Sequence, residues 1–245
     1  MKNQKDEVIT GNTQHLKILY QDEWILVVYK PSGLLSVSVN QNHKIKSAES
    51  VLETILRKKG TYSSSRKPLP VHRLDRDTSG VMIFALNKNA QKKIMDNWQE
   101  LVTSRCYRAL AENPKKINIP AEGTIDKPLA FNAYNVAYVP KKEDIAAKKL
   151  KIVSAITHYK VLNFGKKYTF FELELETGRK NQIRAHLASM GFPLAGDTNY
   201  RAKTNPFNRL CLHARTIEFV HPFTNEKLKF EVPEPSQWTC CGEKK

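Results

Sequence analysis

One segment in the last third of the chain alternates strictly between apolar and acidic residues, and it constrains the fold more than any other feature. Residues 171–176 read Phe-Glu-Leu-Glu-Leu-Glu. Side chains of a β-strand point alternately to the two faces of a sheet, so this period of two predicts a strand with one buried and one solvated face. The chain is therefore expected to contain a sheet.

Other segments predict further strands and a smaller number of helices. Apolar runs indicate strands at residues 24–29, 81–86, 105–111, 210–220 and 228–232. Helices are expected from a capping box at Ser50 to Gly60, over residues 87–101 with Asn87 as cap, and over 181–190. Residues 112–151 indicate a hairpin-like, solvated excursion. Strands that cluster with a few helices favour the α+β class over a doubly wound α/β arrangement.

The 245 residues contain no internal repeat and no Gly/Ser-rich linker, which predicts a single large domain. We expect a polar tail over 1–14, one domain over 15–237 and a short tail over 238–245. The apolar runs are strand-sized and too short to span a bilayer, and no apolar signal core follows the N-terminus. These features predict a cytoplasmic protein with no membrane partner.

The charge of the chain predicts a polyanionic partner. It carries 40 Lys and Arg against 24 Asp and Glu, a formal net charge of +16. Nucleic acid is favoured over an anionic membrane surface because no basic amphipathic helix stands out. The four cysteines lack C-x-x-C spacing, so no zinc site is expected, and reduced thiols fit a cytosolic protein.

A dense group of charges lies directly before the strand expected at 81–86. Arg73, Asp75, Arg76 and Asp77 follow one another within five residues. A carboxylate between guanidinium groups stays ionised, because positive charge favours its charged form, and it can then act as a nucleophile or an electrostatic stabiliser. The alternative is a turn with structural ion pairs, which is the more common role of an isolated Asp–Arg pair.

A second basic group is expected at the start of the helix over 181–190. Arg179, Arg184 and His186 lie near its N-terminal half, where the helix dipole favours anions. Arg184 can reach a carboxylate or a phosphate from there. Taken alone, a basic residue on a helix more often belongs to the solvated surface.

Several blocks of this sequence together resemble the RluA family of RNA pseudouridine synthases. The longest are 72–80 (HRLDRDTSG), 178–187 (GRKNQIRAHL) and 191–200 (GFPLAGDTNY); 25–34 (ILVVYKPSGL) and 105–107 (RCY) resemble shorter family elements. The matches occur in the expected order over residues 16 to about 235, which makes coincidence a poor explanation.

The resemblance implies a single catalytic domain with a mixed, mainly antiparallel sheet, flanking helices and a central basic cleft. It also implies isomerisation of specific uridines to pseudouridine in structured rRNA or tRNA. The family often carries an N-terminal RNA-binding module. About 15 residues precede the first expected strand, so a minimal member without this module is expected.

The resemblance also implies roles for individual residues. It makes Asp75 the catalytic carboxylate, paired with Arg184. Tyr107 is expected to pack on the uracil, and Arg73 to fill the space that the flipped nucleotide leaves. Other expected contacts to RNA or to the base are Arg76, Arg179 and Leu187, the last in an apolar wall. The sequence departs from the family pattern at Asn181, where a His is common, which puts the local hydrogen bonding in question.

The chemistry that the family carries out needs no cofactor. Moving uracil from an N-linked to a C-linked ribose involves no net redox change, and the sequence has neither a nucleotide-binding Gly-rich loop nor a metal-ligand cluster. The target base must leave its stack to be reached. We expect a monomer with no obligatory protein partner.

Two alternatives to the isomerase stay open at this point. A base-excising N-glycosidase would need a second carboxylate to activate water, and Asp77 is the only candidate close to Asp75 in sequence. In a non-catalytic RNA-binding module, Asp75 would serve only in an ion pair.

Overall fold

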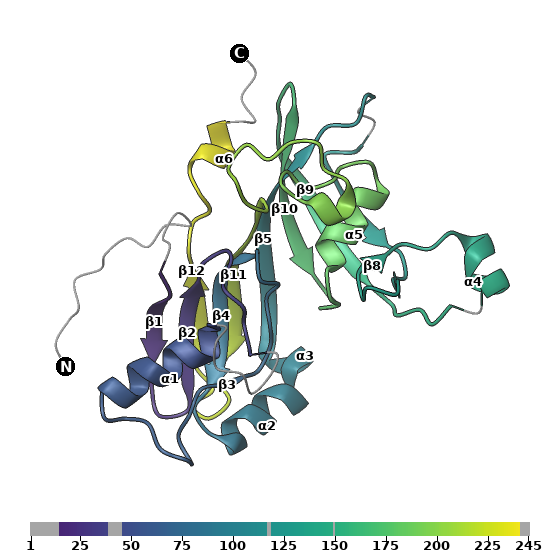
Figure 1. Cartoon of the computed structure of the whole chain (residues 1–245). Coiled ribbons are helices and arrows are strands. Elements are labelled where there is room, and N and C mark those ends of the chain that lie inside the picture. Colours follow the sequence, from purple (N-terminus) through teal and green to yellow (C-terminus); the bar gives the residue numbers. More distant parts are fainter. Residues whose placement is uncertain (1–14, 39–45, 117–118, 149, 241–245) are drawn as a thin grey trace.

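The computed structural model describes residues 15–38, 46–116, 119–148 and 150–240, and in it ten strands form one sheet (Figure 1). Its order is β1-β2-β4-β11-β5-β10-β9-β6, with β3 also paired to β4 and β12 to β11. The strands are β1 Lys17–Gln21, β2 Ile25–Lys30, β3 Leu69–Pro70, β4 Ser79–Ala85, β5 Val102–Glu112, β6 Glu122–Asp126, β9 Ile156–Phe164, β10 Tyr168–Leu175, β11 Leu212–Val220 and β12 Lys227–Glu231. All pairings in this sheet are antiparallel except that of β4 with β11. The expected α+β class and mixed, mainly antiparallel sheet are therefore confirmed.

Helices cover both faces of the sheet at the β2–β4 end. α1 (Ala48–Lys58) packs with Leu26 and Val28 of β2, whereas α2 (Lys88–Asp96) packs in the cluster that holds Ile25 and Val27. Alternate residues of β2 thus enter different clusters, and the whole strand is buried. At the other end, α5 (Gln182–Ser189) lies beside β9 and β10 (Figure 1). No helix in the described part of the chain is long and apolar enough to cross a membrane.

The first helix begins earlier than the sequence predicts. Ser47, not Ser50, is the N-cap of α1: its backbone is extended, with φ −125° and ψ 165°, and its side chain accepts a hydrogen bond from the Ser50 N–H. Ser50 completes the capping box by accepting from the Ser47 N–H. Two serines three residues apart offer two possible starts, and the earlier one brings Ala48 into the core.

The helix expected over 87–101 is two helices. Asn87 caps α2 as predicted, but the chain breaks at Asn97 before α3 (Trp98–Leu101). The Asn97 side chain donates to the Lys93 carbonyl, which satisfies a free acceptor at the end of α2. Competition of this kind between side chain and backbone explains why the periodic apolar pattern does not continue as one helix.

The excursion expected over 112–151 contains more structure than a solvated hairpin. β6 adds to the edge of the main sheet, β7 (Ala130–Phe131) and β8 (Ala137–Tyr138) form a hairpin, and α4 (Lys142–Lys148) follows. The β9 strand after it was not expected at all.

The folded unit extends beyond the expected boundary at residue 237. α6 (Gln237–Cys240) buries Trp238 completely against Leu110 and Phe170. The domain therefore runs to at least Cys240, because a buried tryptophan is part of the core. The tail expected over 1–14 and residues 241–245 lie outside the described residues.

Candidate active site

The charged block lies in a short loop between β3 and β4. Residues 32–36, which follow β2, form hydrogen bonds with the backbone of this loop. The Ser36 hydroxyl donates to the Leu74 carbonyl at 2.7 Å and accepts from the Leu74 N–H at 3.1 Å. The Ser32 hydroxyl donates to the Asp77 carbonyl, and the Thr78 N–H closes a turn onto the Asp75 carbonyl. The backbone on both sides of Asp75 is thereby fixed.

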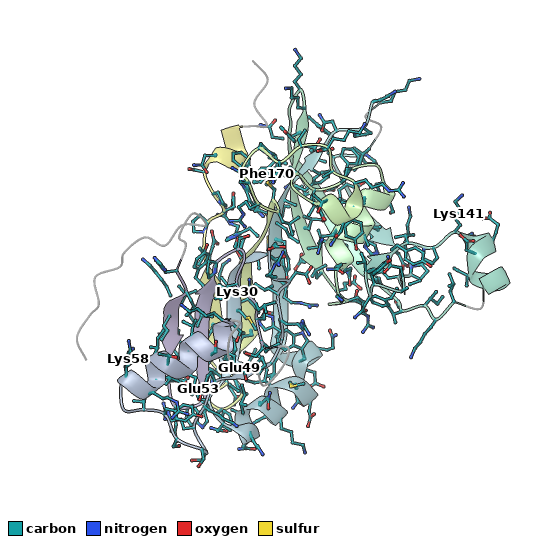
Figure 2. The ribbon with its side chains drawn as sticks, in the orientation of Figure 1. Lys30, Glu49, Glu53, Lys58, Lys141 and Phe170 are labelled. Carbon is teal, nitrogen blue, oxygen red and sulfur yellow. The ribbon has the colours of Figure 1, made fainter. Side chains whose placement is uncertain are left out.

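Lys30, at the end of β2, stabilises the same loop from within the core (Figure 2). Its side chain is fully buried and its Nζ donates to the carbonyls of Pro31, Leu34 and Arg76 at 2.7–3.0 Å. Burial lowers the pKa of Lys30 to about 7, partly offset by the charge of Asp77. The amine therefore links residues 31–34 to the loop that carries Asp75 through hydrogen bonds.

Gly80 allows the strand after the loop to approach β11 closely. Its φ is +128°, and a Cβ at this position would lie 2.1 Å from the carbonyl oxygen of Ala214. No other residue fits there without backbone movement. The glycine at the end of the charged block is thus explained by the one parallel contact of the sheet.

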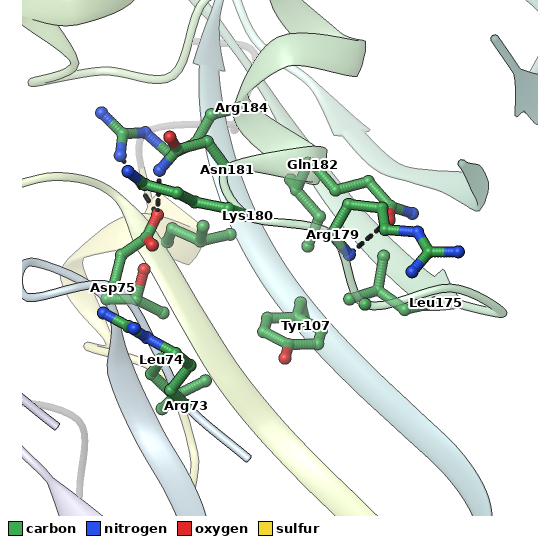
Figure 3. Close-up of a pocket in the computed structure, with 14 residues that line it drawn as sticks. Arg73, Leu74, Asp75, Tyr107, Leu175, Arg179, Lys180, Asn181, Gln182 and Arg184 are labelled. Carbon is green, nitrogen blue, oxygen red and sulfur yellow. Dashed lines mark hydrogen bonds and ion pairs between the residues drawn. The ribbon is translucent and has the colours of Figure 1, made fainter. Parts of the chain in front are cut away.

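The carboxylate of Asp75 points to the start of α5 and is held by two donors (Figure 3). Its Oδ2 accepts from Nη1 of Arg184 at 3.1 Å and from Nδ2 of Asn181 at 2.6 Å. The Asp75 side chain is 26% exposed and that of Arg184 is 11% exposed. The carboxylate is thus partly accessible, while Arg184 is largely shielded from water. The ion pair expected between Asp75 and Arg184 is present.

Arg184 is itself held by a second carboxylate. Asp197, whose side chain is 1% exposed, accepts from Nε of Arg184 at 2.6 Å and from Nη2 at 2.8 Å. Burial lowers the pKa of Arg184, but the hydrogen bonds and charge of Asp197, and then of Asp75, raise it overall. Such a bidentate contact fixes the guanidinium plane, so the remaining nitrogen is directed at Asp75.

Asn181 has an unusual backbone for a residue at a helix start. It is the N-cap of α5 with φ 54° and ψ 19°, and its side chain makes no capping hydrogen bond. Asparagine tolerates this left-handed region better than most residues. The side-chain amide is thereby free to serve Asp75 rather than the helix.

An open cavity of about 170 Å³ lies beside Asp75. Its lining includes Arg73, Asp75, Tyr107, Arg179 and Arg184, together with Asn181, Lys180 and the apolar side chains of Leu74, Leu175, Ile183 and Leu212. Tyr107, on β5, has a pKa raised by burial and by the charge of Asp75, while Arg105 lowers it. Its phenol therefore stays neutral. Arg73 is exposed at the cavity.

The remaining residues expected in the site lie around this cavity. Leu187 is fully buried in the cluster with Ile183 and does not line the cavity, so it supports the wall from behind rather than meeting a base. Arg76 is exposed, outside the lining, and paired with Asp77. His186 is buried, hydrogen-bonded to Thr157 and to the Lys127 carbonyl, and does not line the cavity.

Three contributors escaped the sequence reasoning. The sequence places Asp197 and Lys30 only within longer blocks that match the family, and Asn181 only at a departure from the family pattern. The signals in the sequence are a lysine at the end of an apolar run, directly before Pro-Ser-Gly, and an acidic residue after Gly196. Neither shows from spacing alone that it meets the charged loop.

Comparison with known sequences identifies relatives along most of the chain. A family model described as RNA pseudouridylate synthase matches residues 24–189. The tRNA pseudouridine synthase C of Vibrio parahaemolyticus is 32% identical over 243 residues, which is 91% of this chain and 92% of the relative. The ribosomal large subunit pseudouridine synthase D of Pseudomonas aeruginosa is 32% identical over 241 residues, 91% of this chain and 69% of the relative.

Solved structures share the fold. Human RNA pseudouridylate synthase domain containing 4 superposes with a TM-score of 0.68 at 22% identity, covering 91% of this chain and 90% of that structure. Domain containing 1 gives a TM-score of 0.67 at 23% identity, covering 91% and 84%. The family model spans more than half of the chain and the relatives match nearly all of it, which confirms the resemblance to RluA-type synthases: the chain belongs to the RNA pseudouridylate synthase family.

Proposed function

We propose that this protein isomerises a uridine to pseudouridine in structured rRNA or tRNA, with Asp75 as the catalytic carboxylate. The observation that carries the proposal is the placement of Asp75: its Oδ2 is held by Arg184 and Asn181 at the wall of a cavity that Tyr107 also lines. A carboxylate held in this way is oriented by its donors and partly accessible from the cavity.

The proposed reaction balances without any co-reactant. The bond between N1 of uracil and C1′ of ribose breaks, a bond between C5 and C1′ forms, the proton on C5 leaves and N1 gains one. One carboxylate suffices, either as a nucleophile at the sugar or as a base that takes a proton from it. Asp75 is the residue to which we assign this step, and Arg184 holds its charge.

The other residues of the cavity are assigned to holding an extruded base. A base inside a stack is out of reach, and taking it out costs a few kcal/mol. Arg73 is exposed beside the cavity and can offset part of this cost by stacking in the vacated space. Tyr107 offers a ring surface to the uracil as it turns, and Arg179 is placed to contact phosphate.

The class of RNA follows from charge and from the relatives. A formal charge of +16 favours a polyanion, and the relatives named above act on tRNA or on the large ribosomal subunit. The family match supports neither the glycosidase nor the binding-module alternative. A monomeric state and a cytoplasmic location stay predictions.

Incubation of the purified protein with unmodified rRNA and tRNA tests the proposal. We expect one or a few uridines to become pseudouridine, with no free uracil released. Release of uracil would indicate a glycosidase instead, and RNA binding without either product would indicate a binding module. Both of these results contradict the proposal.

A further inference from the structure

The hairpin formed by β7 and β8 carries exposed large hydrophobic side chains, among them Phe131 and Tyr134. Within the described residues, the large hydrophobic side chains that are exposed are Met95, Phe131, Tyr134, Ile152 and Leu162. Three of these five lie on the hairpin or next to Val153, which pairs with Leu129 just before β7. Tyr134 is 88% exposed, far more than the other four. An exposed apolar group of this kind commonly marks an interaction surface.

The tip that carries Tyr134 is well organised. The Asn132 side chain accepts hydrogen bonds from the backbone N–H groups of Tyr134 and Val136, both at 3.0 Å. Asn135 adopts φ 57° and donates its N–H to the Asn132 carbonyl at 2.8 Å. The backbone of Tyr134 is therefore fixed while its ring extends into solvent.

The same tip is fastened to the wall of the candidate active site. Lys180, which lines the cavity, donates from Nζ to the Asn135 carbonyl at 2.7 Å. The Tyr200 hydroxyl donates to the Ala137 carbonyl at 2.6 Å, and the ring of Tyr200 lies 5.1 Å from the Arg184 guanidinium. Figure 1 shows β8 beside α5, with α4 projecting beyond it. Tyr134 thus occupies a defined position next to the cavity.

Positive charge surrounds this hairpin. Residues 127–142 contain three lysines and no acidic residue, with Asp126 directly before this segment and Glu143 and Asp144 directly after it. Lys127 and Lys151 are exposed beside the hairpin, and Arg179 donates from Nε to the Ser154 carbonyl close to the same segment. Aromatic rings beside basic side chains are the features that bind single-stranded nucleic acid, because bases stack on the ring and phosphates meet the cations.

We infer that the β7–β8 hairpin is a second RNA contact, in which Tyr134 stacks on an unpaired base that neighbours the target uridine. The inference rests on the proposed function, since it assumes that RNA enters the adjacent cavity. Continuity with the cavity and the exposed aromatic ring among lysines and Arg179 favour RNA over a protein partner as the occupant. Tyr134 would then contribute to RNA affinity and not to the chemical step.

Substitution of Tyr134 tests the inference. For Tyr134→Ala we expect the KM and the Kd for substrate RNA to rise roughly 5- to 150-fold, the effect of losing one base–aromatic stack, with kcat at saturation unchanged. Tyr134→Trp keeps a stacking surface and is expected to bind within a few-fold of the wild type. Leu162→Ala is the matched control, because it removes another exposed apolar side chain, on β9.

The outcomes separate this inference from the proposed function. A wild-type affinity in Tyr134→Ala overturns the inference and leaves the exposed surface to a protein partner. A loss as large in Tyr134→Trp as in Tyr134→Ala also overturns it, since the ring would not be stacking. If the wild type neither binds nor modifies RNA, the proposed function fails instead.

Discussion

Replacement of Asn181 isolates the second donor to Asp75. The amide of Asn181 lies 2.6 Å from Oδ2 of Asp75, shorter than the 3.1 Å contact with Arg184. Glycine at this position accepts the left-handed φ of 54° but removes the amide, whereas alanine removes the amide and strains the backbone. The two variants therefore separate the hydrogen bond from the backbone conformation.

The expected loss follows from the strength of a hydrogen bond to a charged group. Such a bond contributes about 1.5–3 kcal/mol. If the amide keeps Asp75 oriented for the reaction, Asn181→Gly lowers kcat about 10- to 150-fold with little change in RNA affinity. Asn181→Ala is expected to lose the same activity and, in addition, about 1–2 kcal/mol of unfolding free energy from the strained φ.

Steady-state conversion of uridine to pseudouridine, together with denaturant unfolding, measures both effects. Asn225→Gly is the matched control, because Asn225 also has a left-handed backbone, with φ 60°, but lies in the turn between β11 and β12. It is expected to keep wild-type kcat. A wild-type kcat in Asn181→Gly would refute the reasoning, since the amide would then contribute nothing to the reactive state of Asp75.

Three further predictions concern groups that support the site. Asp197→Asn is expected to weaken the hold on Arg184 and lower kcat about 10- to 100-fold, measured with the same assay; unchanged kcat would contradict a positioning role. Because burial lowers the pKa of Lys30 to about 7, the unfolded state binds more protons between pH 7 and about 10. The wild type should therefore gain unfolding free energy relative to Lys30→Met as pH rises through this window, by up to about 1.4 kcal/mol per pH unit, and a constant difference in denaturant titrations would rule this out. Gly80→Ala places a Cβ 2.1 Å from the Ala214 carbonyl oxygen and should lose about 4 kcal/mol or more of unfolding free energy. A near-normal thermal stability would contradict this, because it would show that β4 and β11 can move apart at little cost in free energy.

Local patterns predicted the strands that contain a continuous apolar run, such as β2 and β4, and the strand with alternating apolar and acidic residues, β10. In β10 the alternation holds at Leu173, which is buried, and Glu174, which is exposed, whereas Glu172 is half-buried and pairs with Arg108. β9 escaped prediction because its buried positions include Thr157 and Tyr159, whose polar atoms hide the alternation. The early start of α1 and the break at Asn97 depend on local side-chain hydrogen bonds, which periodicity does not reveal.

The site could be anticipated only in part. Asp75 and Arg184 are 109 residues apart, so their pairing came from resemblance to a family and not from spacing. Asp197 and Lys30 act through contacts that only the folded chain creates. Leu187 shows that membership of a matching block does not place a residue at the cavity. Its side chain is fully buried and lies behind the cavity wall.

The central claim is that the carboxylate of Asp75 carries the reaction, and Asp75→Asn tests it most directly. The variant keeps the size of the side chain, so RNA affinity should stay within a few-fold of the wild type while kcat falls on the order of 10⁴-fold or more. Asp77→Asn, which removes an exposed carboxylate two residues away, should keep most of its turnover. Pseudouridine formation by Asp75→Asn at a rate near that of the wild type would contradict the account.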